Sequence, residues 1–579
     1  MSTGIRSFFS NLRKKRIIEI LAAFIGGGWL ILEFVHWLLV DHYHFPEKTI
    51  DITFITILGT LLCTLIWRWF SGWEEPRKFK LELVLIPLVV LITVLLDINL
   101  LLHLKIPESE TFPAPKWRNS IAVLPFDNIS PEQGQDYFCD GLTDELITKL
   151  SKIKDLKVIA KTSTFSFKGK EIDIRDIGKK LNVATVLEGG VRKAGNKLRI
   201  TAQLINVADA SHLWSDTYDR EITDIFTIQE EIALAIVDAL RLRILGEERT
   251  KLVKRPTENL EAYNLYILGR YFFNRATEED FKKSIAYFLQ ALAKDPSFAL
   301  AYAGLANTYV YLCWDVWMAP KEGYPKAREA ATKALELDES LGEAHAALGT
   351  IKFYFDWDLS GAELEFQRAL KLSAGSPTVY SLYGYYLSLT GRFNEAIACF
   401  MRAIELDPVT PGAIFDLGMS YSLAGRYDEA TAQFKRNLDL DPNYFWAQFW
   451  LALNFAFKGL HSEAMAQADK MKSLWPWTEN DPVSLGYSGW IYAIGGRKEA
   501  ARNKLDRLLD LRSKRYVDGY LIGAIYAGSG EKEKAFQWLT KAYEERSANM
   551  VELKVIPVLN NLRSDPRYHE LLKKMGFVK

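Results

Sequence analysis

Cysteine is scarce in this sequence, and neither sign of charge is in excess. The four cysteines, Cys63, Cys139, Cys313 and Cys399, are scattered and form no CxxC pair. We therefore expect isolated buried thiols, with neither a disulfide framework nor a zinc site. Lysine and arginine together number 72, as do aspartate and glutamate, so the formal net charge is zero. Because proteins that read nucleic acids are usually basic, this balance predicts no nucleic-acid partner.

Catalytic motifs are lacking as well. The sequence contains no GxxxxGK(S/T) loop, no GxSxG elbow and no HExxH pair. Asp216 and Asp219 lie beside Arg220, but they lack the context of paired catalytic carboxylates, and we interpret them as a charged strand end. Gly189 and Gly190 fit a hairpin better than a phosphate-binding loop. We predict that the chain is not an enzyme and uses no cofactor and no metal.

Long apolar runs are present in the first hundred residues, at 17–40, 52–70 and 83–104. Each is close to the roughly 20 residues that a helix needs to span a bilayer, so we predict a membrane anchor of three transmembrane helices within residues 1–104. Basic residues precede the first run and flank the loop between the second and third runs. Because positive charge stays on the cytoplasmic side, the region after the third run is expected outside the cytoplasm.

The expected location is thus the bacterial cytoplasmic (inner) membrane, with a multi-pass anchor and a periplasmic soluble region. The third run contains Pro87 and Asp97. If this run did not span the bilayer, the soluble region would face the cytoplasm instead.

A proline-containing linker at residues 105–117 leads into a predicted α/β domain at residues 118–245. Apolar and polar residues alternate in two segments of this block, which are joined by a glycine-containing connection and predict a β-hairpin. We expect strands at 120–126, 158–160, 183–192, 197–206 and 211–218, and helices at 141–154 and about 224–243.

A spacing near 34 residues dominates the carboxy half. In five copies a small residue is followed by glycine seven positions later and by alanine after five more: Gly384/Gly391/Ala396, Gly418/Gly425/Ala430, Ala452/Gly459/Ala464, Gly489/Gly496/Ala501 and Gly523/Gly530/Ala535. Such a period predicts stacked helix pairs. Small residues allow close helix approach, and the middle glycine ends the first helix. We expect about eight pairs at residues 259–557 and a helical cap at residues 558–579.

This repeat resembles the tetratricopeptide repeat family. The best copy carries the family's residues at Ile414, Leu417, Gly418, Tyr421, Ala430, Phe434 and Pro442. The resemblance implies that the first helix of each pair lines a concave groove. The residues at those positions are Ser381, Tyr385, Phe415, Met419, Trp446, Phe449, Leu453 and Phe457.

These groove residues are mostly apolar, which predicts a protein or peptide partner whose apolar or aromatic-rich segment docks as an extended chain or a helix. The alternative is that several of the rings pack between neighbouring repeats.

The middle block resembles the TolB amino-terminal-like domain, which occurs in many bacterial proteins between membrane anchors and tetratricopeptide arrays. The matching stretches are 121–130, 137–147, 162–170, 186–205 and 213–233. This resemblance implies a fold more than a function.

Together these features predict a multidomain membrane protein with three transmembrane helices, an α/β (TolB amino-terminal-like) domain and an all-α tetratricopeptide solenoid. We expect a membrane-anchored extracytoplasmic scaffold that binds protein partners through its apolar concave groove. The alternative function is a sensor or regulatory subunit of a transmembrane signalling system whose output domain lies on another chain. The sequence does not determine the oligomeric state.

Overall fold

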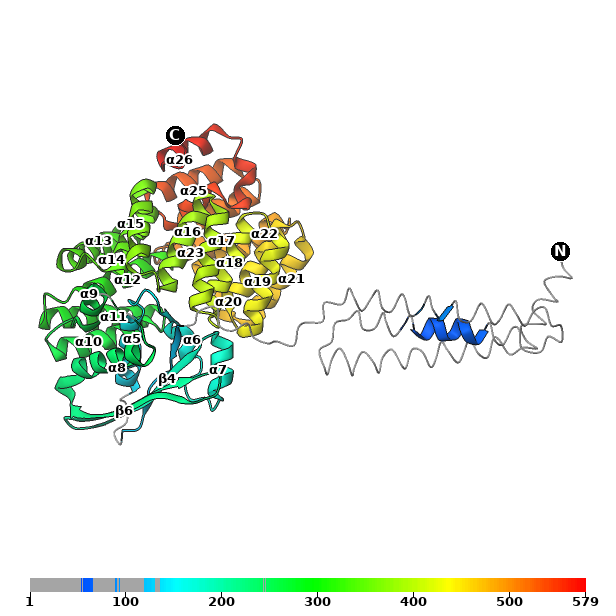
Figure 1. Ribbon diagram of the computed structural model, residues 1–579. Coiled ribbons are helices and arrows are strands. Elements are labelled where there is room, and N and C mark those ends of the chain that lie inside the picture. The colour runs from blue at the N-terminus through cyan, green and yellow to red at the C-terminus, as the bar shows by residue number, and fades with distance from the viewer. Residues whose placement is uncertain are drawn as a thin grey trace, which may run out of the picture. The chain divides into compact units, whose positions relative to one another are not determined.

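The computed structural model describes residues 54, 56–65, 89–90, 93, 119–130, 136–242, 244 and 246–578. By its internal contacts the chain divides into two units, Met1–Ala114 and Pro115–Lys579. The second unit contains a mixed-sheet domain followed by a solenoid of helix pairs (Figure 1).

None of the helices in the described residues is both long and apolar enough to cross a bilayer. The predicted fold class of a membrane protein with three transmembrane helices is therefore wrong for the described part of the chain, and so is the multi-pass inner-membrane location. Of the expected span 52–70, the structure describes residue 54 and residues 56–65, which are helical. The expected span 17–40, most of 83–104 and the linker 105–117 lie outside the described residues.

In the described residues, six strands form the sheet of the α/β domain. They are β1 (Ser120–Val123), β2 (Asp127–Asn128), β3 (Lys157–Val158), β4 (Thr185–Ala194), β5 (Lys197–Asn206) and β6 (His212–Glu221). Their order is β3-β1-β4-β5-β6, and β2 also pairs with β4. The sheet is mixed, because β1 runs parallel to β3 and β4 while β4, β5 and β6 are antiparallel.

The predicted hairpin is present as β4 and β5, with Thr185 opposite Asn206 and Ala194 opposite Lys197. Gly195 in the turn has a φ of 59°, a left-handed conformation that glycine adopts without strain. Along β5 the apolar residues are buried and the polar residues between them are more exposed, so one face of this strand packs on the core.

Helices cover both faces of the sheet. They are α5 (Asp136–Leu150), α6 (Lys161–Phe165), α7 (Ile174–Leu181), α8 (Ile225–Ala239), preceded by the 3-10 turn η2 (Ile222–Asp224), and α9 (Gly246–Val253). One apolar cluster joins β5 to α5 and α8, and continues without a break into the first repeats. A smaller cluster beneath α7 includes Ala122, Leu181 and Val186. The α/β domain therefore shares its larger core with the repeats.

The solenoid consists of successive helix pairs, from α10 with α11 to α24 with α25. Its helices are α10 (Leu260–Phe273), α11 (Glu278–Lys294), α12 (Ala299–Trp314), α13 (Pro320–Leu337), α14 (Gly342–Ile351), α15 (Leu359–Leu372), α16 (Pro377–Thr390), α17 (Phe393–Leu406), α18 (Pro411–Leu423), α19 (Tyr427–Leu440), α20 (Phe445–Phe457), α21 (His461–Leu474), α22 (Pro482–Ile494), α23 (Lys498–Arg512), α24 (Gly519–Gly528) and α25 (Lys532–Glu544). A π-helical turn, η3 (Lys352–Asp356), extends α14, and the 3-10 turn η4 (Pro476–Glu479) precedes α22. The chain ends in η5 (Ala548–Lys554), η6 (Pro557–Leu562) and α26 (Pro566–Lys574).

Helix α16 illustrates why these segments begin and end where they do. The Ser376 side chain accepts a hydrogen bond from the backbone N–H of Val379, and Pro377 occupies the first turn, where its missing N–H costs nothing. At the other end Gly391 has a φ of 87° and donates to the last carbonyls of the helix. The cap, the proline and the glycine thus fix the two ends of α16, which has 14 residues, as its partner α17 does.

The solenoid curves until distant parts of the chain meet (Figure 1). Segment η5 contacts α12, η3 and α16, and the Lys554 ammonium donates to the carbonyl of Thr390 at 2.8 Å. On another side, the backbone N–H of Ala160 before α6 donates to the carbonyl of Leu406 at 2.9 Å. The α/β domain therefore contacts both the first repeat and the middle of the solenoid, and it encloses space between them.

Candidate functional site

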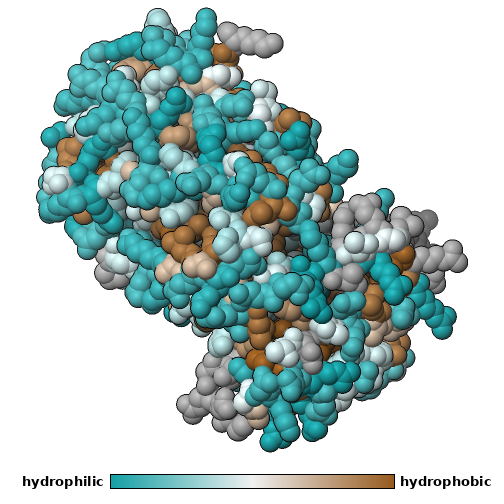
Figure 2. All heavy atoms as spheres, turned by 90° about the vertical axis from the view of Figure 1, so that its left-hand side faces the viewer, coloured by the Kyte–Doolittle hydropathy of each residue, from teal (hydrophilic) through white to brown (hydrophobic). Residues whose placement is uncertain are grey.

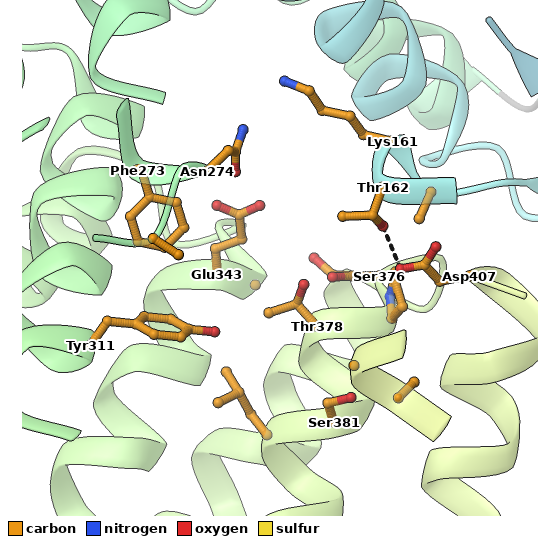
Figure 3. Close-up of a pocket in the computed structure, with 18 of the residues that line it drawn as sticks. Lys161, Thr162, Phe273, Asn274, Tyr311, Glu343, Ser376, Thr378, Ser381 and Asp407 are labelled. Carbon is orange, nitrogen blue, oxygen red and sulfur yellow. Dashed lines mark hydrogen bonds between the residues drawn. The ribbon is translucent and has the colours of Figure 1, made fainter. Parts of the chain in front are cut away.

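A cavity of about 1770 Å³ lies between the α/β domain and the inner helices of the repeats. Its walls come from α5, α6 and α10 on one side and from α12, α16, α18, α20, α22 and η5 on the other. In Figure 3, Lys161 and Thr162 reach toward it from α6, while Tyr311, Glu343 and Thr378 point into it from the repeats. Figure 2 shows the side of the molecule at the left of Figure 1, where hydrophobic residues gather in hollows between hydrophilic ones.

Thr162 and its neighbour close one edge of this cavity. The Thr162 hydroxyl donates to the Asp407 carboxylate (Figure 3). This carboxylate also accepts hydrogen bonds from Ser163 and, at 2.7 Å, from Thr410. The backbone N–H of Val409 in turn donates to the Ser163 hydroxyl at 3.1 Å. We call this group the α6 latch, because it joins α6 to the loop between α17 and α18.

Four aromatic residues form part of the wall deeper in the solenoid: Tyr311 and Trp314 of α12, Tyr354 of η3 and Tyr385 of α16. The Trp314 ring centroid lies 5.8 Å from that of Tyr311, 5.3 Å from that of Tyr354 and 5.1 Å from that of Tyr385. Rings at these separations attract one another and hold one another in place. We call these four residues the aromatic cluster.

Three carboxylates, Asp315, Asp416 and Glu552, line the same cavity as the aromatic cluster. The Tyr385 hydroxyl donates to Asp416, and the Tyr487 hydroxyl donates to Glu552 at 3.2 Å. Burial raises the pKa of each of these carboxyl groups to about 7. Within the described residues, no basic nitrogen lies within 4.0 Å of any of the three. They therefore carry partial negative charge near neutral pH without a counter-ion in the fold.

Two basic groups of the cavity, Lys161 and Arg270, have acidic partners near the α/β domain. Asp144 accepts from Lys161 at 3.2 Å and from Arg270 at 3.4 Å. Arg270 also pairs with Glu343 at 3.4 Å. These cations hold the pKa of Asp144 below its ordinary value even though the residue is buried. The cavity thus has a neutralised end next to α5 and α6 and an acidic, aromatic end inside the repeats.

The structure divides the predicted groove residues into two groups. Five of them line the cavity: Ser381, Tyr385, Phe415, Met419 and Trp446. The other three, Phe449, Leu453 and Phe457, do not line it: Phe449 and Leu453 are buried, with Phe449 packed 5.3 Å from the Tyr487 ring, and Phe457 packs at the edge of the core. Partner binding by the cavity-lining group stays a prediction.

Sequence reasoning missed the carboxylates and most of the aromatic cluster. Asp416 did carry a signal, since it stands in the apolar stretch of α18 between Phe415 and Leu417 and is only 7% exposed. Glu552 carried none, because η5 follows the last helix pair and reaches the cavity only through the curvature of the solenoid.

Comparison with known families supports the repeats. A family model described as tetratricopeptide repeat matches residues 377–410 and 411–444, which contain α16 to α19. The predicted tetratricopeptide solenoid is therefore confirmed, with a mixed-sheet domain before it.

A different family model matches the sheet domain. Residues 117–235 match the second domain of HilA/YgeH-like transcriptional regulators. The predicted TolB amino-terminal-like domain is not supported by any of these comparisons and is corrected accordingly. Short strands alternating with helices are common to many α/β domains, so the stretches that carried the resemblance do not distinguish among them.

One curated relative is "Putative adenylate cyclase 3" of Rhizobium meliloti (strain 1021), which is 42% identical over 190 residues. The match covers 32% of this chain and 32% of the relative, so the chain spans about a third of that relative's length. The prediction that the chain has no enzyme function is contradicted by this relative, which is named as an enzyme. The prediction rested on missing motifs of other enzyme classes, and such absences exclude only those classes.

Several solved tetratricopeptide proteins resemble parts of the chain. The structure of YrrB, titled a TPR protein with an unusual peptide-binding site, is 24% identical, with a TM-score of 0.24, over 33% of this chain and 92% of that chain. PilF of Pseudomonas aeruginosa is 21% identical, with a TM-score of 0.29, over 38% of this chain and 94% of that chain. A repeat protein of Parabacteroides merdae is 17% identical, with a TM-score of 0.32, over 47% of this chain and 98% of that chain.

Proposed function

We propose that this chain is a regulatory, partner-binding protein of a signalling system, and that a peptide segment of its partner enters the cavity between the α/β domain and the repeats. The observation that carries the proposal is the cavity itself, which is large, lined by aromatic rings and bounded by two parts of the chain. Cavities of this kind, with apolar walls and a few placed polar groups, are the usual binding sites of proteins.

The comparisons favour signalling over a purely structural scaffold. One match is to a domain of transcriptional regulators and another is to a protein named as an adenylate cyclase. Both names belong to proteins that convert a signal into an output. We infer that the α/β domain and the repeats together form the receiving part of such a system, and that the partner is a protein with which the signal is exchanged.

Site-specific photocrosslinking in cells tests this proposal. A benzophenone amino acid placed at Met419, which lines the cavity and is 7% exposed, should give one discrete adduct with a partner. The control position is Met401 on α17, which is 58% exposed and lies outside the cavity lining. Mass spectrometry of the adduct should identify a signalling protein and place the crosslink in one short segment of it.

Two outcomes would contradict the proposal. Equal adducts from Met419 and Met401 would mean that the cavity has no special role in capture. A specific adduct with a protein that has no signalling function would contradict the regulatory role and support a scaffold that binds a partner without signalling.

A further inference from the structure

We propose that the aromatic cluster together with Asp315, Asp416 and Glu552 forms a binding pocket for an organic cation, and that the guanidinium or ammonium group of a basic peptide side chain occupies it. This inference deepens the proposed function and rests on it for the peptide nature of the ligand. The cation chemistry follows from the pocket alone.

The three carboxylates surround the same rings although they come from distant parts of the chain. Asp416 accepts a hydrogen bond from Tyr385, and Asp315 directly follows Trp314. Glu552 belongs to η5, which contacts α12, η3 and α16, the three elements that carry the aromatic cluster. Since the rings of the cluster pack against Trp314, the negative groups converge on one part of the cavity wall. Aromatic faces with nearby carboxylates are the usual environment for a guanidinium or alkylammonium group.

Other buried carboxylates of the described chain show what this pocket lacks. Asp144 pairs with two cations, Glu365 with Lys352 at 2.8 Å, and Glu479 with Lys504. Asp518 is buried without a cation, but it accepts hydrogen bonds from Ser547, from Asn549 and from the backbone N–H of Tyr520. These carboxylates are satisfied within the fold, as buried charges generally are.

Glu552 and Asp315 are satisfied less completely. The buried Oε2 atom of Glu552 has no hydrogen-bond partner. Asp315 has another acidic residue, Asp481, as its charged neighbour, and this neighbour raises its pKa further. A bound cation would supply the missing donors and offset the repulsion. The same placement would be costly for an anionic ligand group, and a neutral group would leave the negative charge uncompensated, so the pocket selects for positive charge.

Titration calorimetry with the purified full chain tests the inference without knowledge of the partner. Nα-acetyl-arginine amide is the probe for a peptide side chain, its citrulline analogue is the neutral control of the same shape, and putrescine represents a free amine. We expect the arginine probe to bind about tenfold or more tightly than the citrulline probe. Asp416→Asn and Glu552→Gln should each weaken arginine binding by about tenfold, whereas Glu336→Gln, at an exposed residue of α13, should leave it unchanged.

The pH dependence supplies a second readout that needs no variant. Facing Asp416 are Tyr385 of α16, Tyr311 of α12, Tyr354 of η3 and Tyr444 before α20, and burial keeps all four neutral by raising their pKa values. Asp416 itself ionises near pH 7, and arginine stays charged throughout. Affinity for the arginine probe should therefore rise by several-fold to about tenfold from pH 6 to pH 8. In Asp416→Asn this rise should be smaller.

Equal binding of the arginine and citrulline probes would overturn the inference, and so would an arginine affinity that does not change with pH. Both measurements use the unmodified chain, so they decide the question even if a variant fails to fold. Binding of putrescine but not of the arginine probe would keep the cation chemistry and assign it to a free amine, against the peptide. If none of the three probes binds but Met419 gives a specific crosslink, the cation pocket is rejected and the proposed function stands. If a cation probe binds but no crosslink forms, the cation pocket stands and the proposed function is rejected.

Discussion

At the scale of single residues, the solenoid depends on positions where a side chain is absent. A Cβ atom on Gly418 would lie 2.7 Å from the ring of Phe434 on the neighbouring helix, closer than carbon atoms approach one another. The glycine therefore sets the distance between α18 and α19. The same relation holds between Gly384 and Phe400 in the preceding pair, where the distance is also 2.7 Å.

Gly418→Ala should consequently destabilise the protein by about 1–3 kcal/mol, because the added methyl group forces α18 and α19 apart. Gly412→Ala in the same helix is the matched control. A Cβ atom there meets nothing closer than 4.0 Å, so the change should be neutral or stabilising by about 0.4–1 kcal/mol. Denaturant unfolding of both variants checks this, and an equal effect at the two glycines would mean that the helix contact is not the constraint.

At the scale of elements, the α6 latch decides whether the α/β domain holds the middle of the solenoid. Asp407 is 7% exposed and accepts hydrogen bonds from Thr162, Ser163 and Thr410. Two of these donors belong to α6, which has only five residues and gains little stability from its own backbone hydrogen bonds. The latch therefore supplies much of what positions α6 at the cavity edge.

Asp407→Ala should leave these hydroxyls without their acceptor and cost about 1–3 kcal/mol. We expect hydrogen exchange at residues 161–168 to become at least several-fold faster, because α6 loses its attachment. Asp358→Ala provides the comparison, since Asp358 caps α15 by accepting from Gly361 at 2.9 Å and has no contact with α6. That variant should lose about 1 kcal/mol without faster exchange in α6. Unchanged exchange in Asp407→Ala would show that α6 is held by packing alone.

Elements that follow from local patterns could be predicted from the sequence. The glycine and alanine spacing identified the tetratricopeptide repeats, and the alternation along 197–206 identified the strand that became β5. The latch could not be predicted, because Ser163 and Asp407 are 244 positions apart and no pattern in either segment indicates that the two make contact. The membrane helices were predicted from the length of three apolar runs, and no helix of the described residues is long and apolar enough to cross a bilayer. The domain limits and the groove residues remain predictions.

At the scale of the whole Pro115–Lys579 unit, the C-terminal segment η5 folds back against the repeats and completes the cavity wall. Glu552 reaches the cavity because η5 lies against α12, η3 and α16. Trp357, directly after η3, anchors this return: it stacks 4.9 Å from Tyr543, and the Arg546 guanidinium lies 4.2 Å from its ring centroid. Arg546 also donates to the carbonyl of Phe355 at 3.2 Å, across 191 positions of sequence.

Trp357→Ala should therefore affect two segments at once. The ring is 5% exposed, so its loss should cost about 3–5 kcal/mol and remove the surface on which Tyr543 and Arg546 rest. Because the contact joins η3 to the C-terminal segment, hydrogen exchange should accelerate both at 352–358 and at 546–554, and binding of a cation at Glu552 should weaken with it. Trp477→Ala is the comparison, since that ring is 50% exposed and belongs to η4. Faster exchange confined to 352–358 would mean that the C-terminal segment holds its place without Trp357, and the closure of the solenoid would then rest on the Lys554 and Glu552 contacts instead.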